Sequence, residues 1–249
     1  MSEDRHREIW VCHLGLIPYS DGIALQDTLR SRRRAGEIPD TLLVLEHPPT
    51  YTRGRRTGAG ELPLPDADYE ARGIAVHDVD RGGKVTYHAP GQLVGYPIMA
   101  VGDVGEFLRT MEGAIIAALA QVGIDARSRH EEGIDYTGVW VADRKIASIG
   151  LHVWHDISTH GFAVNVENDL DPFSRVVACG LPNVRMTSLA QEGSSEGIAC
   201  FRKRMAHAYC EAHHARQRLV SAHRLGIDGT TEHPPNKKNP SPTETLVLA

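Results

Sequence analysis

Residues 137–166 contain three successive stretches with the composition of β-strands, and this run constrains the fold more than any other part of the chain. The stretches are "TGVWVAD", "RKIASIGLHVW" and "THGFAVNV", and "ADR" predicts a tight turn between the first two. Strands that follow one another without intervening helices do not fit a doubly wound parallel sheet or an α/β barrel. With the helices predicted elsewhere, the run indicates a mixed α/β (α+β) fold, in which helices pack against a mixed sheet.

The remaining elements are predicted from apolar spacing and breaker residues. Residues 103–123 form the clearest helix, with apolar residues at helical spacing and Gly123 at the end. The other predicted helices lie within residues 18–40 and 194–219, and the other strands are Thr41–Glu46, 73–83 and 92–100. Residues 51–70 are rich in Gly and Pro and are expected to form a loop.

The length of 249 residues suits one sizeable domain, which we expect to span residues 1–227. Residues 228–249 are polar and rich in proline, and we expect this tail to be disordered.

The overall composition excludes several functional classes. A net charge of −5 does not indicate nucleic-acid binding. No apolar run approaches the ~20 residues of a membrane-spanning helix, and the charged N-terminus lacks the apolar core of a signal peptide. We therefore expect a cytoplasmic protein that does not bind membranes, with its four cysteines as reduced thiols.

Known cofactor and metal motifs do not occur in the sequence. There is no G-x-G-x-x-G after a strand and no P-loop, and this pattern argues against a dinucleotide or P-loop enzyme. Cys210 and His214 stand one helical turn apart in "CEAHH", but paired C-x-x-C and H-E-x-x-H motifs do not occur. We expect no metal site.

The first segment that can carry chemistry is "DRGGKVTYHAPGQLVGYP", residues 80–97. Gly82 and Gly83 follow a predicted strand, and paired glycines let a ligand contact bare backbone. An ordinary turn between strands would have the same glycines. Arg81, Lys84 and His88 add polar side chains and favour a ligand-lining loop at the strand end.

Lys145 is the second candidate. Strand alternation places it on one face with the apolar residues Ala147, Ile149 and Leu151. Either its stem is covered while the amine reaches solvent, or the amine is desolvated, which disfavours the charged form and makes a usable base. Position alone does not decide between these two interpretations.

His160 and Cys179 complete the set. His160 precedes an apolar strand and is interpreted as scaffolding or as part of a pocket wall. Cys179 lies in "VVACGLPN", and a free cysteine usually packs as a small buried hydrophobe. At a junction before Gly180 it can instead face a cleft, where a neighbouring lysine would have to activate the thiol.

Taken together, these segments resemble the lipoyl(octanoyl) transferase family, also called lipoate-protein ligase B. "RGGKVTYHAPGQLVGY" is similar to the family signature, and "RKIASIG", "HGFAVNV" and "ACG" follow in the family's order. "LLVLEHPPTYTRGRR" resembles its early strand and loop. One departure is Ala89, where many members have glycine, and the insert at residues 128–136 is not matched to the family.

The resemblance implies the α/β catalytic fold of biotin- and lipoate-protein ligases and a role for each matching residue. Cys179 would be the nucleophile, and Lys145 the lysine that activates the thiol and moves protons. The acyl-binding residues would be Arg81, Gly82, Gly83, Lys84, Val85, Thr86, Tyr87, His88, Ser148, Ile149, Gly150, Gly161, Phe162 and Ala163.

The reaction implied by the resemblance is octanoyl transfer without a cofactor or a metal. The donor would be octanoyl-acyl carrier protein, and the acceptors would be lysines of lipoyl domains in 2-oxoacid dehydrogenases and of glycine-cleavage H protein. Because acyl carrier protein is typically acidic, Arg53, Arg55, Arg56 and the basic run at 32–34 are predicted to steer it, although that run also suits a helix C-terminus. Two alternatives stay open: an ATP-dependent lipoate ligase on the same fold, and a non-catalytic acyl-binding module.

Overall fold

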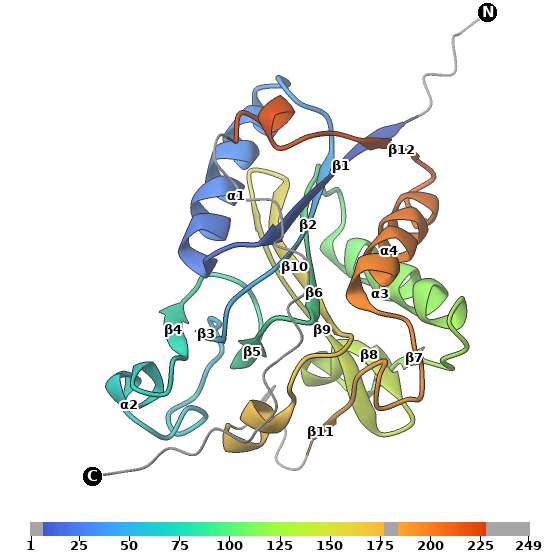
Figure 1. The fold of residues 1–249 in the computed structure, drawn as a ribbon. Coiled ribbons are helices and arrows are strands. Elements are labelled where there is room, and N and C mark those ends of the chain that lie inside the picture. The colour runs from blue at the N-terminus through green and yellow to red at the C-terminus, as the bar shows by residue number, and fades with distance from the viewer. Residues whose placement is uncertain (1–6, 177–183, 228–249) are drawn as a thin grey trace, which may run out of the picture.

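The computed structural model describes residues 7–176 and 184–227, and these build a central mixed sheet with helices on both faces (Figure 1). The strands are β1 (Glu8–Leu16), β2 (Thr41–Glu46), β3 (Thr50–Arg53), β4 (Ala75–Asp78), β5 (Thr86–His88), β6 (Gln92–Ile98), β7 (Arg127–Ser128), β8 (Gly138–Val141), β9 (Arg144–Trp154), β10 (Ile157–Asn165), β11 (Arg185–Met186) and β12 (Arg216–Leu219). The helices are α1 (Tyr19–Arg34), α2 (Asp66–Glu70), α3 (Val104–Ala120) and α4 (Ile198–Ala212), with short 3-10 helices at His130–Glu132, Ile134–Tyr136, Asp171–Arg175 and His223–Leu225.

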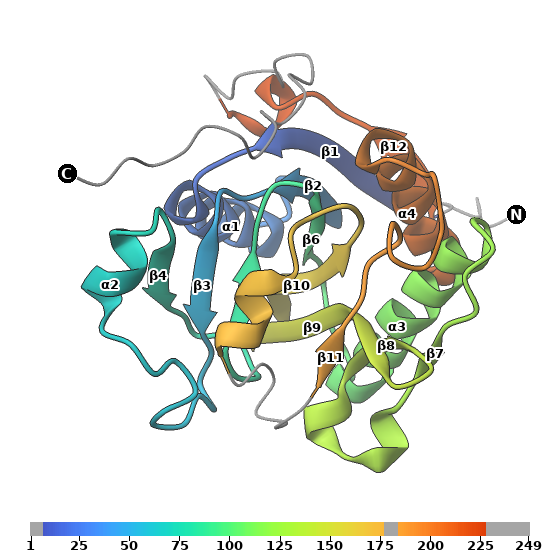
Figure 2. The same ribbon diagram turned by 60° about the horizontal axis from the view of Figure 1, so that its bottom comes forward.

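The central sheet has the order β12-β1-β2-β6-β10-β9-β8-β7, and β11 pairs with β9 off this path. The β12–β1 and β1–β2 pairs are parallel, whereas the pairs from β2 to β7 along this order are antiparallel. The sheet is therefore mixed, as the uninterrupted strand run predicts. A smaller sheet, β4-β3-β5, lies beside it (Figure 2).

Both faces of the central sheet are buried, which explains the continuous apolar run of β2. Leu42 and Val44 face the core under α3 and α4, whereas Leu43 and Leu45 face the core under α1. A strand with two apolar faces has no polar alternation. Figure 1 shows α1 on one side of the sheet and the α3–α4 pair on the other.

Several sequence predictions are confirmed in position as well as type. The strand predicted at Thr41–Glu46 is β2 with the same bounds. The helix predicted at 103–123 is α3: Asp103 caps it by accepting a hydrogen bond from the Glu106 backbone N–H, and Gly123 follows its end with φ +79°. The tight turn predicted at "ADR" joins β8 to β9, with Ala142 at φ +51°.

Other predictions are wrong. Residues 51–70 are not all loop, because β3 pairs with β4 and β5 and because α2 begins after Pro65. The predicted last helix ends at Ala212, and residues 216–219 form strand β12 instead of continuing it. In both places long-range strand pairing overrides the local pattern.

Candidate functional site

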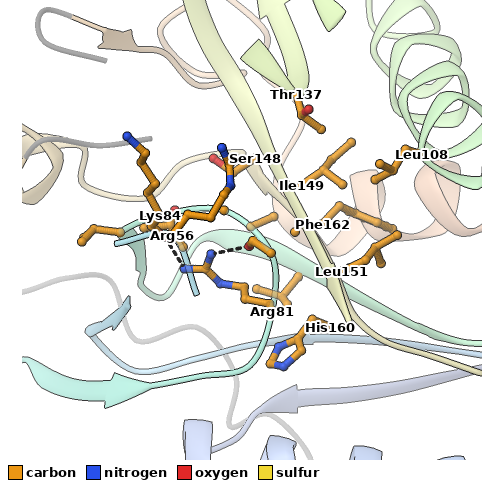
Figure 3. Close-up of a pocket in the computed structure, with 18 of the residues that line it drawn as sticks. Arg56, Arg81, Lys84, Leu108, Thr137, Ser148, Ile149, Leu151, His160 and Phe162 are labelled. Atoms are coloured by element: carbon orange, nitrogen blue, oxygen red, sulfur yellow. Dashed lines mark hydrogen bonds between the residues drawn. The ribbon is translucent and has the colours of Figure 1, made fainter. Parts of the chain in front are cut away.

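A cavity of about 230 Å³ lies beside the central sheet, with walls from the 81–88 loop, from β9 and β10, and from α3. Three predicted segments that are far apart in the sequence meet here. Figure 3 shows Ile149, Leu151 and Phe162 on one side of the group, with Lys84 and Arg56 on the other. The predicted residues that line the cavity are Arg81, Gly82, Gly83, Lys84, Val85, Thr86, His88, Lys145, Ser148, Ile149, Gly150, Gly161, Phe162 and Ala163.

Arg81 holds the loop in shape from within. Its side chain is almost fully buried, and Nη2 donates to the carbonyl oxygens of Thr52 (3.0 Å) and Lys84 (2.8 Å). The Gly82 backbone N–H donates to Leu151 O at 2.8 Å, which ties the loop to β9. Gly150 allows this approach, because a Cβ atom there would lie 2.8 Å from the Gly82 carbonyl oxygen.

Tyr87 does not line the cavity, although the resemblance places it in the acyl-binding loop. It is the middle residue of β5, so its side chain points away from those of Thr86 and His88. Its ring packs against Tyr51 and Phe173, with centroid distances of 5.1 and 5.6 Å. Tyr87 therefore belongs to the core under the smaller sheet.

Lys145 lines the cavity, but it does not share a face with Ala147. The pairing of β8 with β9 shifts by one residue at Ile146, so that Ile146 and Ala147 both reach the core under α3. This bulge turns Lys145 to the other face, where its Nζ lies 5.3 Å from the centre of the Trp140 ring. Periodicity in the sequence has no signal for such a bulge.

The Lys145 side chain is 2% exposed, so the buried interpretation is the one that the structure supports. It runs past Gly138, whose missing Cβ would lie 2.7 Å from Lys145 Cε. The lysine backbone is also held: its carbonyl accepts a hydrogen bond from the Thr187 N–H at 2.9 Å, and its neighbour in β11 is Met186.

Cys179, the predicted nucleophile, lies in the segment 177–183, outside the described residues. The other three cysteines are described. Cys12 and Cys210 are buried, and burial raises the pKa of their thiols to about 11 and about 12. Cys200 is exposed on α4. Buried thiols with raised pKa values are poor nucleophiles at neutral pH, so Cys12 and Cys210 act as packing residues.

Sequence reasoning missed three of the ring side chains at one end of the cavity. Tyr19 and Tyr96 line this end together with the predicted His88, and His47 lies behind them. The Nδ1–H of His47 donates to Ile17 O at 2.8 Å, so its Nε2 accepts from the Tyr96 hydroxyl at 2.7 Å. The signal is weak, because these residues come from separate strands and from the start of α1.

Burial sets the ionisation of this group. It lowers the pKa of His47 to about 4 and that of His88 well below its usual range, and it raises the pKa of Tyr19 to about 12. The rings are therefore neutral at pH 7, and this end of the cavity is polar but uncharged.

His160 closes the same end of the cavity, and the expectation of a pocket wall agrees with its position. Its Nε2–H donates to Asp80 Oδ1 at 2.8 Å, and His152 Nδ1 lies 2.6 Å from Asp80 Oδ2. The hydrogen bond from His160 lowers the pKa of Asp80 to about 2. His160 has φ +57°, an uncommon backbone conformation for a side chain this size.

The opposite end of the cavity has its own missed residues. This end is lined by Leu108 of α3, by Ile134 of the unmatched insert and by Thr137, which follows that insert. Beside them, Arg56 forms an ion pair with Asp135 at 2.7 Å. The insert at 128–136 thus contributes directly to the cavity wall.

Comparison with known proteins agrees with this site. Residues 18–210 match the profile of the lipoyl protein ligase A/B catalytic domain. The chain belongs to the lipoyl protein ligase A/B catalytic domain family. It is 46% identical over 202 residues to an octanoyltransferase of Rubrobacter xylanophilus, which covers 76% of this chain and 86% of the relative. A mitochondrial octanoyltransferase of Arabidopsis thaliana is 38% identical, covering 77% and 81%.

The resemblance to the lipoyl(octanoyl) transferases is thereby confirmed, and this family member is an acyltransferase of that type. Among solved structures, a putative lipoate protein ligase from T. acidophilum has a TM-score of 0.69 at 20% identity, covering 86% of this chain and 88% of that one. At this identity the likeness shows the shared fold alone, and it confirms the predicted fold class.

Among residues 7–176 and 184–227, no group of three or more His, Cys, Asp or Glu side chains is arranged to hold a metal ion. No helix in these ranges has the length and apolar character needed to cross a bilayer.

Proposed function

We propose that this chain transfers an octanoyl group from octanoyl-acyl carrier protein to the ε-amine of a lysine on a lipoyl domain or on glycine-cleavage H protein. The acyl group would pass through a thioester on Cys179. The observation that supports this most directly is Lys145, a buried lysine at the wall of a cavity lined largely by apolar groups and glycine backbone.

The cavity suits a medium-length alkyl chain. Between its two ends, the side chains of Val94, Ile149 and Phe162 present apolar surface. Each methylene buried there contributes about 0.8 kcal/mol, so an eight-carbon chain supplies much of the binding free energy.

The first step would form the acyl-enzyme. The Cys179 sulfur bonds to the thioester carbonyl carbon, the bond from that carbon to the pantetheine sulfur breaks, and the thiol proton ends on the pantetheine sulfur. Lys145 would take this proton and deliver it. Thioester exchange between two thiols is nearly balanced, so the step needs no ATP.

The second step would form the amide. The acceptor nitrogen bonds to the acyl carbon, the bond to the Cys179 sulfur breaks, and a proton from the amine returns to that sulfur. Lys145 would again carry the proton. Conversion of a thioester to an amide is downhill and completes the transfer.

The proposal of close contact between Lys145 and Cys179 draws support from the chain beyond residue 183. The description resumes at Val184, and Met186 pairs with Lys145. Cys179 precedes Val184 by five residues, and an extended chain of that length spans at most about 18 Å. This connection limits how far Cys179 lies from the lysine.

Most of the arginines predicted to steer the acidic carrier are already neutralised. Arg53 forms ion pairs with Asp66 and Asp78, each at 2.7 Å, and Arg56 pairs with Asp135. In the basic run, Arg33 pairs with Asp40 at 2.8 Å. Arg34 and Arg55 have no ion pair with a described residue. The Arg34 guanidinium lies 5.5 Å from the centre of the Trp154 ring, so we assign the steering role to Arg55.

Intact-mass analysis tests the proposed route. The chain is mixed with octanoyl-acyl carrier protein without acceptor, and an octanoyl adduct is expected on the wild type and absent from Cys179→Ala. The matched control is Cys200→Ser, which removes an exposed thiol and should keep the adduct. Undiminished transfer by Cys179→Ala would refute the thioester. Transfer that requires ATP and free octanoate would identify a ligase instead.

A further inference from the structure

A second cavity, of about 420 Å³, lies behind the polar end of the first. Its walls come from the first turns of α1, from β4 and the residues that follow it, and from β10. Among the described residues, Tyr19 and His160 alone line both cavities. These two side chains therefore stand between them.

Tyr19 forms a ring layer across this boundary. Its ring stacks on His77, which lines the second cavity, at a centroid distance of 5.2 Å, and on His88, which lines the first, at 5.6 Å. A third ring, that of His47, lies 4.9 Å from it. At 4% exposure and with contacts on both ring faces, Tyr19 has little freedom to move aside.

His160 completes the boundary and is held just as firmly. Asp80 binds its Nε2, and its backbone N–H donates to the side-chain oxygen of Gln26. The ring is 3% exposed, and the unusual φ of this residue points it at the cavity end. Figure 3 shows His160 and Thr137 at opposite ends of the cavity-lining group.

The position of this boundary relative to Lys145 follows from strand pairing. Lys145 lies at the start of β9, whereas His160 pairs with Leu151, six residues further along the strand. An acyl chain attached near Lys145 and directed along β9 therefore runs toward Tyr19 and His160, which line the same cavity.

We propose that Tyr19 and His160 form the end wall of the acyl cavity and set the longest chain that this enzyme transfers. The inference rests on the proposed function, because it takes the cavity to hold the acyl chain. A longer chain would have to displace two packed side chains, and His160 is also hydrogen-bonded to Asp80 on its far side.

The second cavity is too polar to bind the end of an alkyl chain favourably. The exposed carboxylates of Asp27, Asp78 and Asp80 line it. A chain end that entered this cavity would displace solvent from these carboxylates without replacing its hydrogen bonds. The wall therefore discriminates by polarity as well as by steric exclusion.

The test compares chain lengths on octanoyl-, decanoyl-, dodecanoyl- and tetradecanoyl-acyl carrier protein. Tyr19→Ala and His160→Gly each remove part of the wall, and glycine accepts the φ of residue 160. The ratio of dodecanoyl to octanoyl transfer should rise about tenfold or more in each variant. Ser20→Ala is the matched control, because Ser20 lines the second cavity alone and should keep the wild-type ratio.

Calorimetric titration with free octanoic and dodecanoic acid gives a second readout that needs no turnover. The wild type should bind octanoate and exclude dodecanoate, and both wall variants should bind dodecanoate. If Tyr19→Ala does not fold, Tyr19→Leu replaces it, and His160→Gly is read independently.

Unchanged transfer ratios in folded wall variants would overturn the end-wall proposal and leave the proposed function intact. Absence of octanoyl transfer by the wild type would instead overturn the proposed function, and the titration would then decide whether the wall limits chain length. Equal binding of octanoate and dodecanoate by the wild type also refutes the wall.

Discussion

Lys145 shares with the Ala147 carbonyl the space that a side chain at Gly138 would fill: a Cβ atom at residue 138 would lie 2.7 Å from Lys145 Cε, 3.4 Å from Nζ and 2.4 Å from Ala147 O. The glycine also has φ +133°. One small residue on β8 therefore decides where the amine of the proposed proton carrier stands.

Gly138→Ala should displace the lysine and lower the transfer rate at least tenfold, with a stability loss of about 3 kcal/mol from steric overlap and backbone strain together. Gly133→Ala is the matched control. Its φ is +124°, but nothing lies within 4 Å of the added Cβ. It should lose about 1 kcal/mol and keep its activity. Urea unfolding and transfer assays measure both, and equal activity loss in the two variants would contradict the steric role.

Glu112 supports the same place from α3. This buried carboxylate accepts hydrogen bonds from Gly138 N (2.9 Å) and Ser128 Oγ and pairs with Arg109 at 2.7 Å. Glu112→Ala leaves these donors unpaired and should cost about 3 kcal/mol in urea unfolding. Glu106→Ala, on the exposed first turn of the same helix, should cost about 0.5 kcal/mol. Similar losses of unfolding free energy in both variants would contradict this structural role of Glu112.

The reactivity of Cys179 tests Lys145 directly. Cys12 and Cys210 are buried with raised pKa values, so a Cys200→Ser background leaves Cys179 as the thiol that reacts near neutral pH. In that background Lys145→Ala should move the pH profile of thiol alkylation upward by about one unit, because the thiolate loses a nearby cation or base. A superimposable profile would remove Lys145 from thiol activation.

Stability should fall in mild acid because five histidines have pKa values that burial lowers. Burial lowers the pKa of His13, His47 and His213 from 6.5 to about 4, and it also lowers those of His88 and His160. The unfolded chain protonates these rings near pH 6.5, whereas the folded chain does so only at lower pH, near 4 for the first three. Their contribution is therefore complete above about pH 6.5 and is lost as the pH falls toward 4.

The slope of the unfolding free energy against pH should correspond to uptake of at least about three protons near pH 5. Urea titrations at several pH values measure it. His47→Asn should reduce the slope by about one proton, and a flat wild-type profile between pH 4.5 and 6.5 would contradict the assignment.

Carrier recognition should depend on Arg55 more than on its neighbours. Arg55→Glu should raise the KM for octanoyl-acyl carrier protein several-fold at low salt and less at high salt, because surface attraction is screened. Octanoyl-pantetheine lacks the acidic carrier and should be used equally well by both proteins. A KM change with that small donor would indicate damage to the cavity and not lost steering.

Local patterns predicted the elements whose burial is uniform. The sequence shows the continuous apolar run of β2 and the apolar stripe of α3. Each residue of β2 is buried, and each turn of α3 places apolar residues on the same face. The three motif segments that contain Arg81, Lys145 and Gly161 also met as expected. The bulge at Ile146 and the ring layer of Tyr19 were not predictable, since each depends on a partner in another element: Trp140 of β8, and His77 and His88 from the smaller sheet.

Tyr87 illustrates the limit of motif transfer. A motif marks a continuous stretch of sequence, but strand geometry sends alternate side chains to opposite sides. Thr86 and His88 face the cavity, whereas Tyr87 supports the loop from the aromatic core.

The parallel pairing of β12 with β1 has a consequence for biosynthesis. Glu8 at the beginning of the chain lies opposite Arg216 near the end of the described part, so the edge of the central sheet is completed only after almost every other element has been synthesised. Until then β1, with its buried Ile9, Val11 and Cys12, offers an unpaired edge to other nascent chains. Such late, long-range closure slows folding, and it makes this edge the place where incomplete chains would aggregate first.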